Sequence, residues 1–380
     1  MTATVDRVVA RVVDRVRRAG LIAPDTFDDV FDRPGSVRAV AVLRIVLGPV
    51  VLGHLWPFLR DTATGTTYDD RFYEPWFGFD PGVPGWVQVV LVWTGAVAAV
   101  GMAAGWRTRW TSAITTACVA GNFFLSQTHF RHNRAFLLFL LVTVTLSASG
   151  RVLSLDARRL RAAGHALDDR ASIWPVWLMR VVASSIYLAS GVSKLIDPDW
   201  AGGLVLWDRA VRHAHLVETR VPEPVAEVVV DVVTIRWVHA LTSPVAVALE
   251  LFIGICLWFA RTRIAAVWAA VFFHLSIEIS ASVEVFSLAA IAALMIWATP
   301  VTRDRVVVAP DARWIRRLDW LARFEICEEP GAVLQVRDRD GAWASERDAL
   351  WMLLARLPLT FFVAAPVDAW RRRRRRAVAT

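Results

Sequence analysis

Eight apolar runs, separated by short loops that carry arginine, dominate this chain and constrain its fold more than any other feature. Most of these runs are close to the ~20 residues that a helix needs to cross a bilayer. A mean hydropathy of +0.44 and a hydrophobic fraction of 56% exclude an ordinary soluble domain. The sequence therefore predicts an all-α polytopic integral membrane bundle of about eight transmembrane helices. The predicted spans are 38–59, 86–106, 110–128, 134–150, 173–194, 242–260, 264–281 and 283–299.

The distribution of arginine among the loops predicts the orientation of the bundle. Loops 107–109, 151–172 and 261–263 all carry arginine, as does the tail from Arg303, and they fall on one side of the predicted membrane. The acidic, aromatic loop 60–85 falls on the other side. Short cytoplasmic loops of membrane proteins carry an excess of Lys and Arg. We therefore expect a multi-pass protein of the plasma membrane with both termini in the cytoplasm.

Composition divides the chain into four regions. Residues 1–36 form a basic amphipathic segment, whose valines and arginines take opposite faces of a helix at 5–19 suited to the inner leaflet. The transmembrane domain occupies 37–300, a small α/β cytoplasmic appendage 301–370, and a polybasic tail 371–380. The six consecutive arginines of this tail favour a solvated segment or a topology anchor. They favour anionic lipid over nucleic acid as a partner.

Shorter elements can be predicted outside the spans. Within the appendage, 305–308 and 333–336 are typical of strands, and 312–322 and 346–357 are typical of helices. Segment 224–237, in the long connection before the sixth span, is too short and too charged to cross a bilayer. It predicts a surface or re-entrant helix.

The cysteines exclude two kinds of site. Cys118, Cys256 and Cys327 are widely spaced, form no CxxC pair, and two of them lie inside apolar runs. This pattern supports neither a disulfide framework nor a zinc site, and no bound metal is expected.

Lys194 is the only lysine among 43 basic Lys and Arg residues, and it ends the fifth predicted span. A guanidinium stays protonated at physiological pH, whereas a desolvated ammonium can release its proton and act as a base. A chain that uses arginine for every other positive charge therefore suggests a proton-transfer role for this lysine. The alternative is a lysine left over in an arginine-biased chain, with its ammonium reaching toward the membrane surface.

Several further polar residues lie on the predicted outer side or inside an apolar span. His129 and His132 lie between the third and fourth spans, and Asp199 and Trp200 follow Lys194. In the seventh span, His274 and Glu278 are spaced i, i+4 and share a helix face. Ionisable residues within a membrane are rare and usually mark a functional cavity. Helix rise places His274 roughly 15 Å deeper than Lys194, so direct contact requires tilt and side-chain reach.

Four segments resemble the membrane-embedded HTTM family, which includes vitamin K-dependent gamma-glutamyl carboxylase. They are AVLRIVLG at 41–48, RHNRAFLLFLL at 131–141, GVSKLIDPDW at 191–200 and FFHLSIEI at 272–279. The resemblance covers roughly residues 30–300, and the segment around Lys194 is its most specific part.

The resemblance implies a quinol-dependent carboxylase-like enzyme with a quinone-sized pocket that opens outward. Lys194 matches the family's catalytic base, His132 lies near a histidine implicated in carboxylation, and His274 matches a third polar position. The implied cofactor is a reduced quinone, similar to vitamin K or menaquinol, with oxygen and carbon dioxide as co-substrates. The candidate cofactor-binding residues are Asp199, Trp200, Glu278 and His129.

Two departures from the family pattern bear on function. The large lumenal region that recognises the propeptide of carboxylase substrates has no counterpart here, so a protein or peptide substrate would be recognised differently. The appendage resembles a DCC-type, thioredoxin-like thiol oxidoreductase module. Where that module carries paired cysteines, this chain has Ala309 to Arg313, and dithiol chemistry is excluded there.

Two functions of different classes remain open. The first is a quinol-dependent membrane enzyme with Lys194 as its base. The second is a non-catalytic membrane protein that acts in the maturation or immunity of a secreted peptide, as some bacterial relatives do. A transporter is disfavoured because the spans show no internal repeat.

Overall fold

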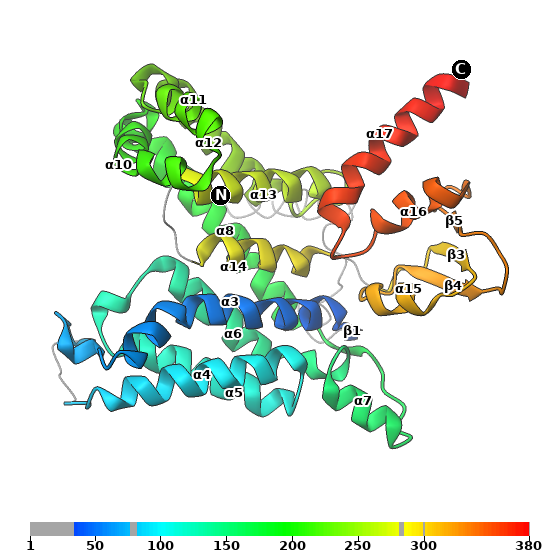
Figure 1. Ribbon diagram of the computed structural model, residues 1–380, viewed down its shortest axis with the longest axis horizontal. Helices are drawn as coiled ribbons and strands as arrows, with labels where there is room; N and C mark the ends of the chain where they lie inside the picture. The colour runs from blue at the N-terminus through cyan, green and yellow to red at the C-terminus, as the bar shows by residue number, and fades with distance from the viewer. Residues whose placement is uncertain (1–33, 77–81, 281–284, 299–300, 380) are drawn as a thin grey trace, which may run out of the picture.

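The computed structural model describes residues 34–76, 82–280, 285–298 and 301–379. These residues form a helical bundle and, beside one end of it, a small α/β unit from which the C-terminal helix projects (Figure 1). The predicted amphipathic helix at 5–19 lies outside the described residues.

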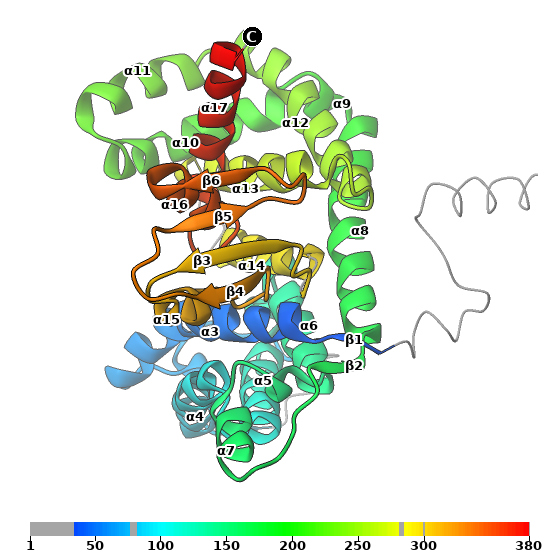
Figure 2. The same ribbon diagram turned by 90° about the vertical axis from the view of Figure 1, so that its right-hand side faces the viewer.

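Helices α3 to α14 build the bundle in two groups. Their bounds are Arg38–Ala63 (α3), Trp86–Ala104 (α4), Thr108–Phe124 (α5), His132–Leu146 (α6), Leu155–Ala162 (α7), Trp174–Ile196 (α8), Pro198–Ala201 (α9), Leu204–Arg220 (α10), Glu223–Val233 (α11), Arg236–Cys256 (α12), Arg263–Ser280 (α13) and Phe286–Ala293 (α14). In Figure 1, α3 to α6 form the lower group and α10 to α13 the upper one. Helix α14 packs against α3, α6 and α13 and so lies between the groups. Helix α8 runs from the lower group to the upper one (Figure 2).

Each of the eight predicted spans contains a helix, but the helices are not all long enough to cross a membrane. Among the described residues, α3, α4, α8 and α12 meet that requirement by length and composition. The third and fourth predicted spans are helices of 17 and 15 residues, α5 and α6. A helix of this length reaches roughly 23–26 Å, less than the ~30 Å hydrocarbon core. The structure therefore supports a membrane bundle with four candidate spans.

The last predicted span is interrupted. Helix α14 is only 8 residues long and continues as a 3₁₀ turn, Leu294–Trp297. In the long connection before α12, the structure has three helices, α9, α10 and α11, of which only α11 was predicted. Helices α10 and α11 carry charge along their length, and for this reason hydropathy alone does not separate α10 from a loop.

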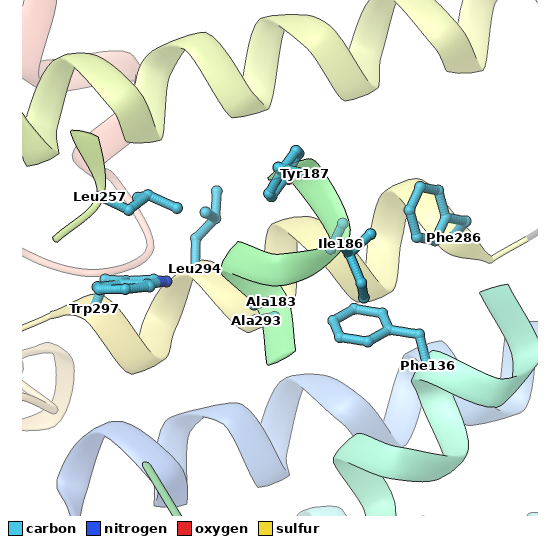
Figure 3. Close-up of a pocket in the computed structure, with 10 residues that line it drawn as sticks. Phe136, Ala183, Ile186, Tyr187, Leu257, Phe286, Ala293, Leu294 and Trp297 are labelled. Atoms are coloured by element: carbon cyan, nitrogen blue, oxygen red, sulfur yellow. The ribbon is translucent and has the colours of Figure 1, made fainter. Parts of the chain in front are cut away.

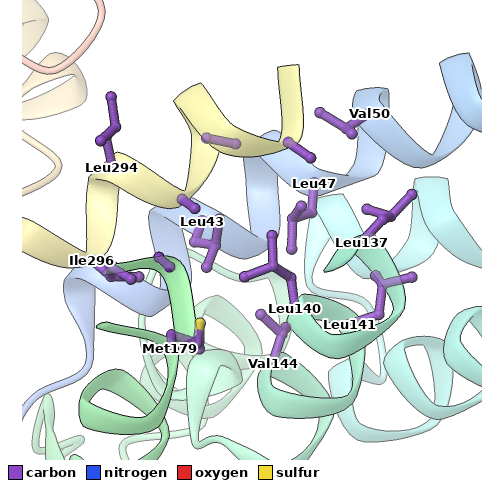
Figure 4. Close-up of a cluster of buried hydrophobic side chains, with 14 of the residues drawn as sticks. Leu43, Leu47, Val50, Leu137, Leu140, Leu141, Val144, Met179, Leu294 and Ile296 are labelled. Carbon is purple, nitrogen blue, oxygen red and sulfur yellow. The ribbon is translucent and has the colours of Figure 1, made fainter. Parts of the chain in front are cut away.

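A continuous apolar core joins the two groups of helices. Leu43 and Leu47 of α3, Leu140 of α6, Met179 of α8 and Ile296 after α14 are all fully buried in it (Figure 4). This core fixes α8 against the lower group, while the second half of α8 is free to pack against α12. The fold therefore positions the C-terminal end of α8, where Lys194 lies.

The C-terminal unit is the small α/β appendage that the sequence predicted. Its four-stranded sheet has the order β4-β3-β5-β6, with β3 and β4 parallel and the other neighbours antiparallel. The predicted helix at 312–322 is shorter than expected, and β4, which carries Cys327, was not predicted. The bounds are Arg305–Ala309 (β3), Arg313–Leu318 (α15), Phe324–Glu328 (β4), Gln335–Arg337 (β5), Trp343–Ser345 (β6) and Glu346–Leu354 (α16).

The polybasic tail is part of helix α17, Phe361–Ala379, and the expectation of a fully solvated tail is wrong for its first two arginines. Arg371 lies 2.7 Å from Asp348 of α16. Arg372 lies 2.6 Å from Asp338, a buried carboxylate that follows β5. Ion pairs thus hold the middle of α17 against the appendage.

Candidate functional site

Lys194, in the last turn of α8, is paired with Glu250 of α12. Its Nζ atom lies 2.5 Å from Glu250 Oε1, and the two side chains are only 17% and 4% exposed. Ser190, one turn earlier on α8, donates a 3.1 Å hydrogen bond to the same carboxylate oxygen. The second oxygen, Oε2, is buried and has no hydrogen-bond partner among the described residues. The ion pair therefore holds a buried carboxylate that keeps one acceptor atom free.

Glu250 was not among the predicted site residues, although its sequence carried the necessary signal. It is the only acidic residue in the 21 residues of α12, and the only charged residue in the predicted span at 242–260. The rule that singled out His274 and Glu278, namely that ionisable residues inside apolar spans are rare and functional, applies equally to Glu250. What the sequence could not supply was its partner, which lies 56 residues away along the chain.

Trp200, a predicted cofactor-binding candidate, is a direct neighbour of Lys194. The Lys194 Nζ atom lies 4.7 Å from the centre of the Trp200 ring, and the Arg209 guanidinium lies 5.3 Å from it. Asp197 accepts a 2.9 Å hydrogen bond from the Asp199 backbone and so initiates the short helix that presents Trp200. Asp199 itself is exposed. The aromatic face of Trp200 thus covers the Lys194 ammonium through a cation–π contact.

His274 reaches α8 through a different residue. Its Nε2 atom lies 2.6 Å from the hydroxyl of Tyr187, and His274 is fully buried. Its other ring nitrogen, Nδ1, has no partner among the described residues. Tyr187 precedes Lys194 by seven residues, about 10 Å along the helix. His274 therefore contacts α8 about two turns before Lys194, on the same helix face.

The residues of α8 that contact the site lie on one face of the helix. Tyr187, Ser190, Gly191 and Lys194 are spaced i, i+3, i+4 and i+7, which places them along one stripe of α8. The stripe faces α12 and α13. Glu278, predicted with His274, is half-buried, and its backbone carbonyl accepts a hydrogen bond from Arg220 of α10. Its carboxylate Oε2 atom has no partner among the described residues.

Two glycines allow α8 and α12 to approach closely enough for the ion pair. A Cβ atom on Gly191 would lie 2.9 Å from a methyl carbon of Leu251, and one on Gly254 would lie 2.8 Å from Leu188. Ser184 donates a 2.6 Å hydrogen bond to the carbonyl of Gly254. Small residues and interhelical hydrogen bonds of this kind are typical of tightly packed membrane helices.

A narrow cavity lies beside the Tyr187–His274 pair. Figure 3 shows Tyr187 and Ile186 of α8 between Phe286 of α14, Phe136 of α6 and the aromatic ring of Trp297. Its volume is about 10 Å³, room for no more than about one water molecule. This cavity is too small for a quinone ring.

His129 and His132 lie in a different part of the bundle. The Nδ1 atom of His129 lies 2.7 Å from the Asn122 carbonyl, and its ring packs against Phe58 of α3. Burial lowers the pKa of His129. His132 begins α6 and packs against Phe130. None of these contacts joins either histidine to the Lys194–Glu250 pair. The grouping of His132 with Lys194 in one site therefore stays a prediction.

The arrangement at the end of α8 is suited to proton transfer. An ammonium and a carboxylate at 2.5 Å can exchange a proton, because separated charges are costly in a water-poor environment. Among the described residues, no group of three or more His, Cys, Asp or Glu side chains could hold a metal ion. The chemistry available at this site is therefore that of an amine, a carboxylate and an aromatic face.

Comparison with known proteins places the chain in a family. Residues 32–301 match the HTTM domain, which covers well over half of the chain. No curated protein and no solved structure matches the chain. The match includes all of α3 to α14 and therefore every residue of the candidate site. This protein belongs to the HTTM family of membrane proteins.

Proposed function

We propose that this protein is an integral membrane enzyme in which Lys194 removes a proton from a reduced quinone at the outer end of α8. The observation that carries the proposal is the pairing of the only lysine with Glu250, a carboxylate buried inside an apolar helix. An ion pair at this depth is expensive to maintain for structural purposes alone, because apolar residues of similar size pack at least as well.

Each residue of the site has a separate role in the proposed proton transfer. Glu250 can take the proton of the Lys194 ammonium, which leaves a neutral amine beside a neutral carboxylic acid. The amine can then accept a proton from an acidic hydroxyl, the group that a quinol supplies. Trp200 offers a flat aromatic surface next to the ammonium. In a carboxylase-like reaction, oxygen and carbon dioxide would be consumed as co-substrates and a peptide or protein would be the acceptor.

The test is the charge-conserving substitution Lys194→Arg. Arginine retains the ion pair but cannot deprotonate, so the variant should insert normally and lose about two to four orders of magnitude in quinol-dependent turnover. Arg212→Lys on the exposed face of α10 is the matched control and should keep full activity. Extraction of quinone from the purified protein measures binding separately. Full turnover in Lys194→Arg would exclude the base role.

A second function is favoured by the small volume of the cavity. With about 10 Å³ beside Tyr187, the bundle as it stands resembles a closed scaffold more than a ligand-binding protein. In this case the protein would act as a non-catalytic membrane partner in the maturation or immunity of a secreted peptide. Lys194→Arg would then retain the cellular phenotype, since a permanent charge still pairs with Glu250.

The orientation in the membrane belongs to the same proposal. We place both termini in the cytoplasm and the outer end of α8 on the opposite side of the plasma membrane, because the arginine-bearing loops share one side. The appendage would then be a cytoplasmic, thioredoxin-like module without paired cysteines. A reporter fused after Thr380 that is active only outside the cell would reverse this assignment.

A further inference from the structure

The two faces of helix α17 differ sharply in their surroundings. One face is held against the appendage by two ion pairs, Arg371 with Asp348 and Arg372 with Asp338. Arg372 also pairs with Asp368, one turn earlier on α17 itself. On the opposite face, Val363 is 74% exposed and Trp370 is 54% exposed. A large apolar side chain and a tryptophan along one exposed stripe of a charged helix are unusual for a surface that meets only water.

Arginines extend this exposed stripe. Arg373 and Arg374 are exposed, and the Arg374 guanidinium lies 4.9 Å from the centre of the Trp370 ring. Within the described part of the chain, no carboxylate pairs with either of them. Arg375 and Arg376 follow directly in the sequence. Helix α17 therefore combines exposed apolar residues, Val363 and Trp370, with a run of four consecutive arginines at 373–376.

The beginning of α17 is fixed to the membrane bundle. The rings of Phe361 and Phe362 lie 5.9 and 5.4 Å from that of Trp268 on α13. Phe362 also packs against the main apolar core. Trp268 follows Arg263, the first residue of α13, by five residues, or about 8 Å along the helix. Helix α17 therefore starts near the level at which the bundle meets the membrane surface, and Figure 1 shows its far end standing clear of the other elements.

We propose that the exposed face of α17 docks on the anionic lipid surface of the membrane in which this protein is embedded. Tryptophan and valine would enter the headgroup region, and Arg373 to Arg376 would contact lipid phosphates. This is the composition expected of an interfacial helix, with an apolar stripe beside a basic cluster. A nucleic acid would use the arginines but leave Val363 exposed, and so charge together with apolar exposure favours lipid.

Docking would have a mechanical consequence, because α17 is the element that joins the appendage to α13. Its ion pairs bind it to the sheet, and its two phenylalanines bind it to the helix that carries His274. A lipid-bound α17 would hold the appendage close to the bilayer. The proposal is independent of the catalytic role of Lys194, and its test needs no activity measurement.

The test uses the full-length protein in vesicles of phosphatidylcholine alone or mixed with phosphatidylglycerol. A fluorophore is attached at Ala369→Cys, next to Trp370 on the exposed face, in a Cys327→Ser background. Quenching by lipid-attached nitroxides then reports proximity to the headgroups. We expect stronger quenching in the anionic vesicles, and its loss as salt rises. The same label at Val333→Cys, in the loop after β4, is the control, and its quenching should differ less between the two lipids than that of the label on α17.

Two charge variants make the test specific. Replacing Arg373 to Arg376 with glutamine should abolish the increase in quenching that phosphatidylglycerol causes. The loss of four charges should lower the ratio of membrane-bound to free α17 on the order of a thousand-fold. Replacing them with lysine should preserve it. Equal quenching in both lipids for the unaltered helix would overturn the proposal. The proposal would also be overturned if the fluorescence of the label changed only when an RNA oligonucleotide was added to the phosphatidylcholine vesicles. That result would assign this face to nucleic acid.

Discussion

The hydroxyl of Tyr187 lies 2.6 Å from Nε2 of His274, so the buried histidine of α13 is held by the same helix that carries Lys194 in its last turn. Because His274 has no partner for its Nδ1 atom among the described residues, the tyrosine supplies the one hydrogen bond that its ring makes. A buried polar group with a single bond depends strongly on that bond.

Removing the Tyr187 hydroxyl should therefore destabilise the bundle. We expect Tyr187→Phe to lower the free energy of unfolding by about 1–3 kcal/mol, because both His274 nitrogens then lack a partner. The double variant Tyr187→Phe/His274→Leu replaces both polar groups with apolar ones and should recover most of the loss. Unfolding in detergent, followed by circular dichroism, measures both. A double variant less stable than Tyr187→Phe would show that the pair does not act as a unit.

The close approach of α8 and α12 gives a prediction whose sign is informative. In a helix interior, Gly→Ala normally stabilises by up to about 1 kcal/mol. At Gly191 the added Cβ would meet Leu251 at 2.9 Å, so we expect Gly191→Ala to destabilise by about 1–3 kcal/mol instead. Ser193→Ala, on the exposed side of the same helix, is the control and should be neutral or stabilising. A stabilised Gly191→Ala protein would mean that the two helices can separate freely.

Asp338 makes the stability of the appendage depend on pH. Burial alone would raise the pKa of Asp338, but a backbone N–H together with Arg356 and Arg372 outweighs it and lowers the pKa to about 2. An unfolded aspartate has a pKa of about 4. The folded appendage thus binds fewer protons than the unfolded one, and stability falls as pH drops from about 4 to about 2. Above this window the contribution, roughly 2 kcal/mol, is fully present.

Asp338→Asn should remove this dependence and destabilise the appendage at neutral pH. Pepsin is active across the acidic window, and its cleavage of residues 301–370, relative to an unfolded substrate, reports the opening of the sheet. We expect the difference between wild type and Asp338→Asn to vanish toward pH ~2. Asp340→Asn, an exposed neighbour, should behave as wild type. A difference that stays constant over the whole range would contradict the assigned pKa.

Local sequence signals predicted the elements of this fold better than their ends. Apolar runs located the bundle helices, and three consecutive valines located β3, because each signal is confined to one segment. The number of spans depended on where each helix stops, and α5, α6 and α14 stop early. Those ends are set by tertiary packing and by loop geometry, neither of which hydropathy describes.

For the candidate site too, the sequence could identify single residues but not the contacts between distant segments. Lys194 and Trp200 are six residues apart and both could be singled out from the sequence, but their contact follows from the turn between α8 and α9. The pairing of Lys194 with Glu250 depends on the antiparallel register of α8 and α12, which the glycines at their interface determine. Arg371 and Arg372 lie in a run that composition marks as solvated. Their pairing with the appendage follows only from the fold.

The Lys194–Glu250 pair provides the sharpest test, because a double-mutant cycle separates its coupling from the cost of each substitution. Lys194→Met leaves the buried Glu250 carboxylate without a counter-charge and should cost about 3–5 kcal/mol of stability. Glu250→Gln should cost less, because the Lys194 ammonium is partly exposed and retains the face of Trp200.

The double variant Lys194→Met/Glu250→Gln should recover most of the stability, which gives a coupling energy well above 1 kcal/mol. The matched control is the same cycle on Arg212 and Asp208, an exposed i, i+4 pair at 2.9 Å on α10, for which about 0.2–1 kcal/mol is expected. Thermal unfolding at matched detergent concentration measures both cycles. If the two coupling energies were equal, Glu250 would not be the counter-charge of Lys194 in the folded protein, and a proton exchange between them would lose its physical basis. A large coupling together with unaltered function in the double variant would instead leave the pair as a structural link between α8 and α12.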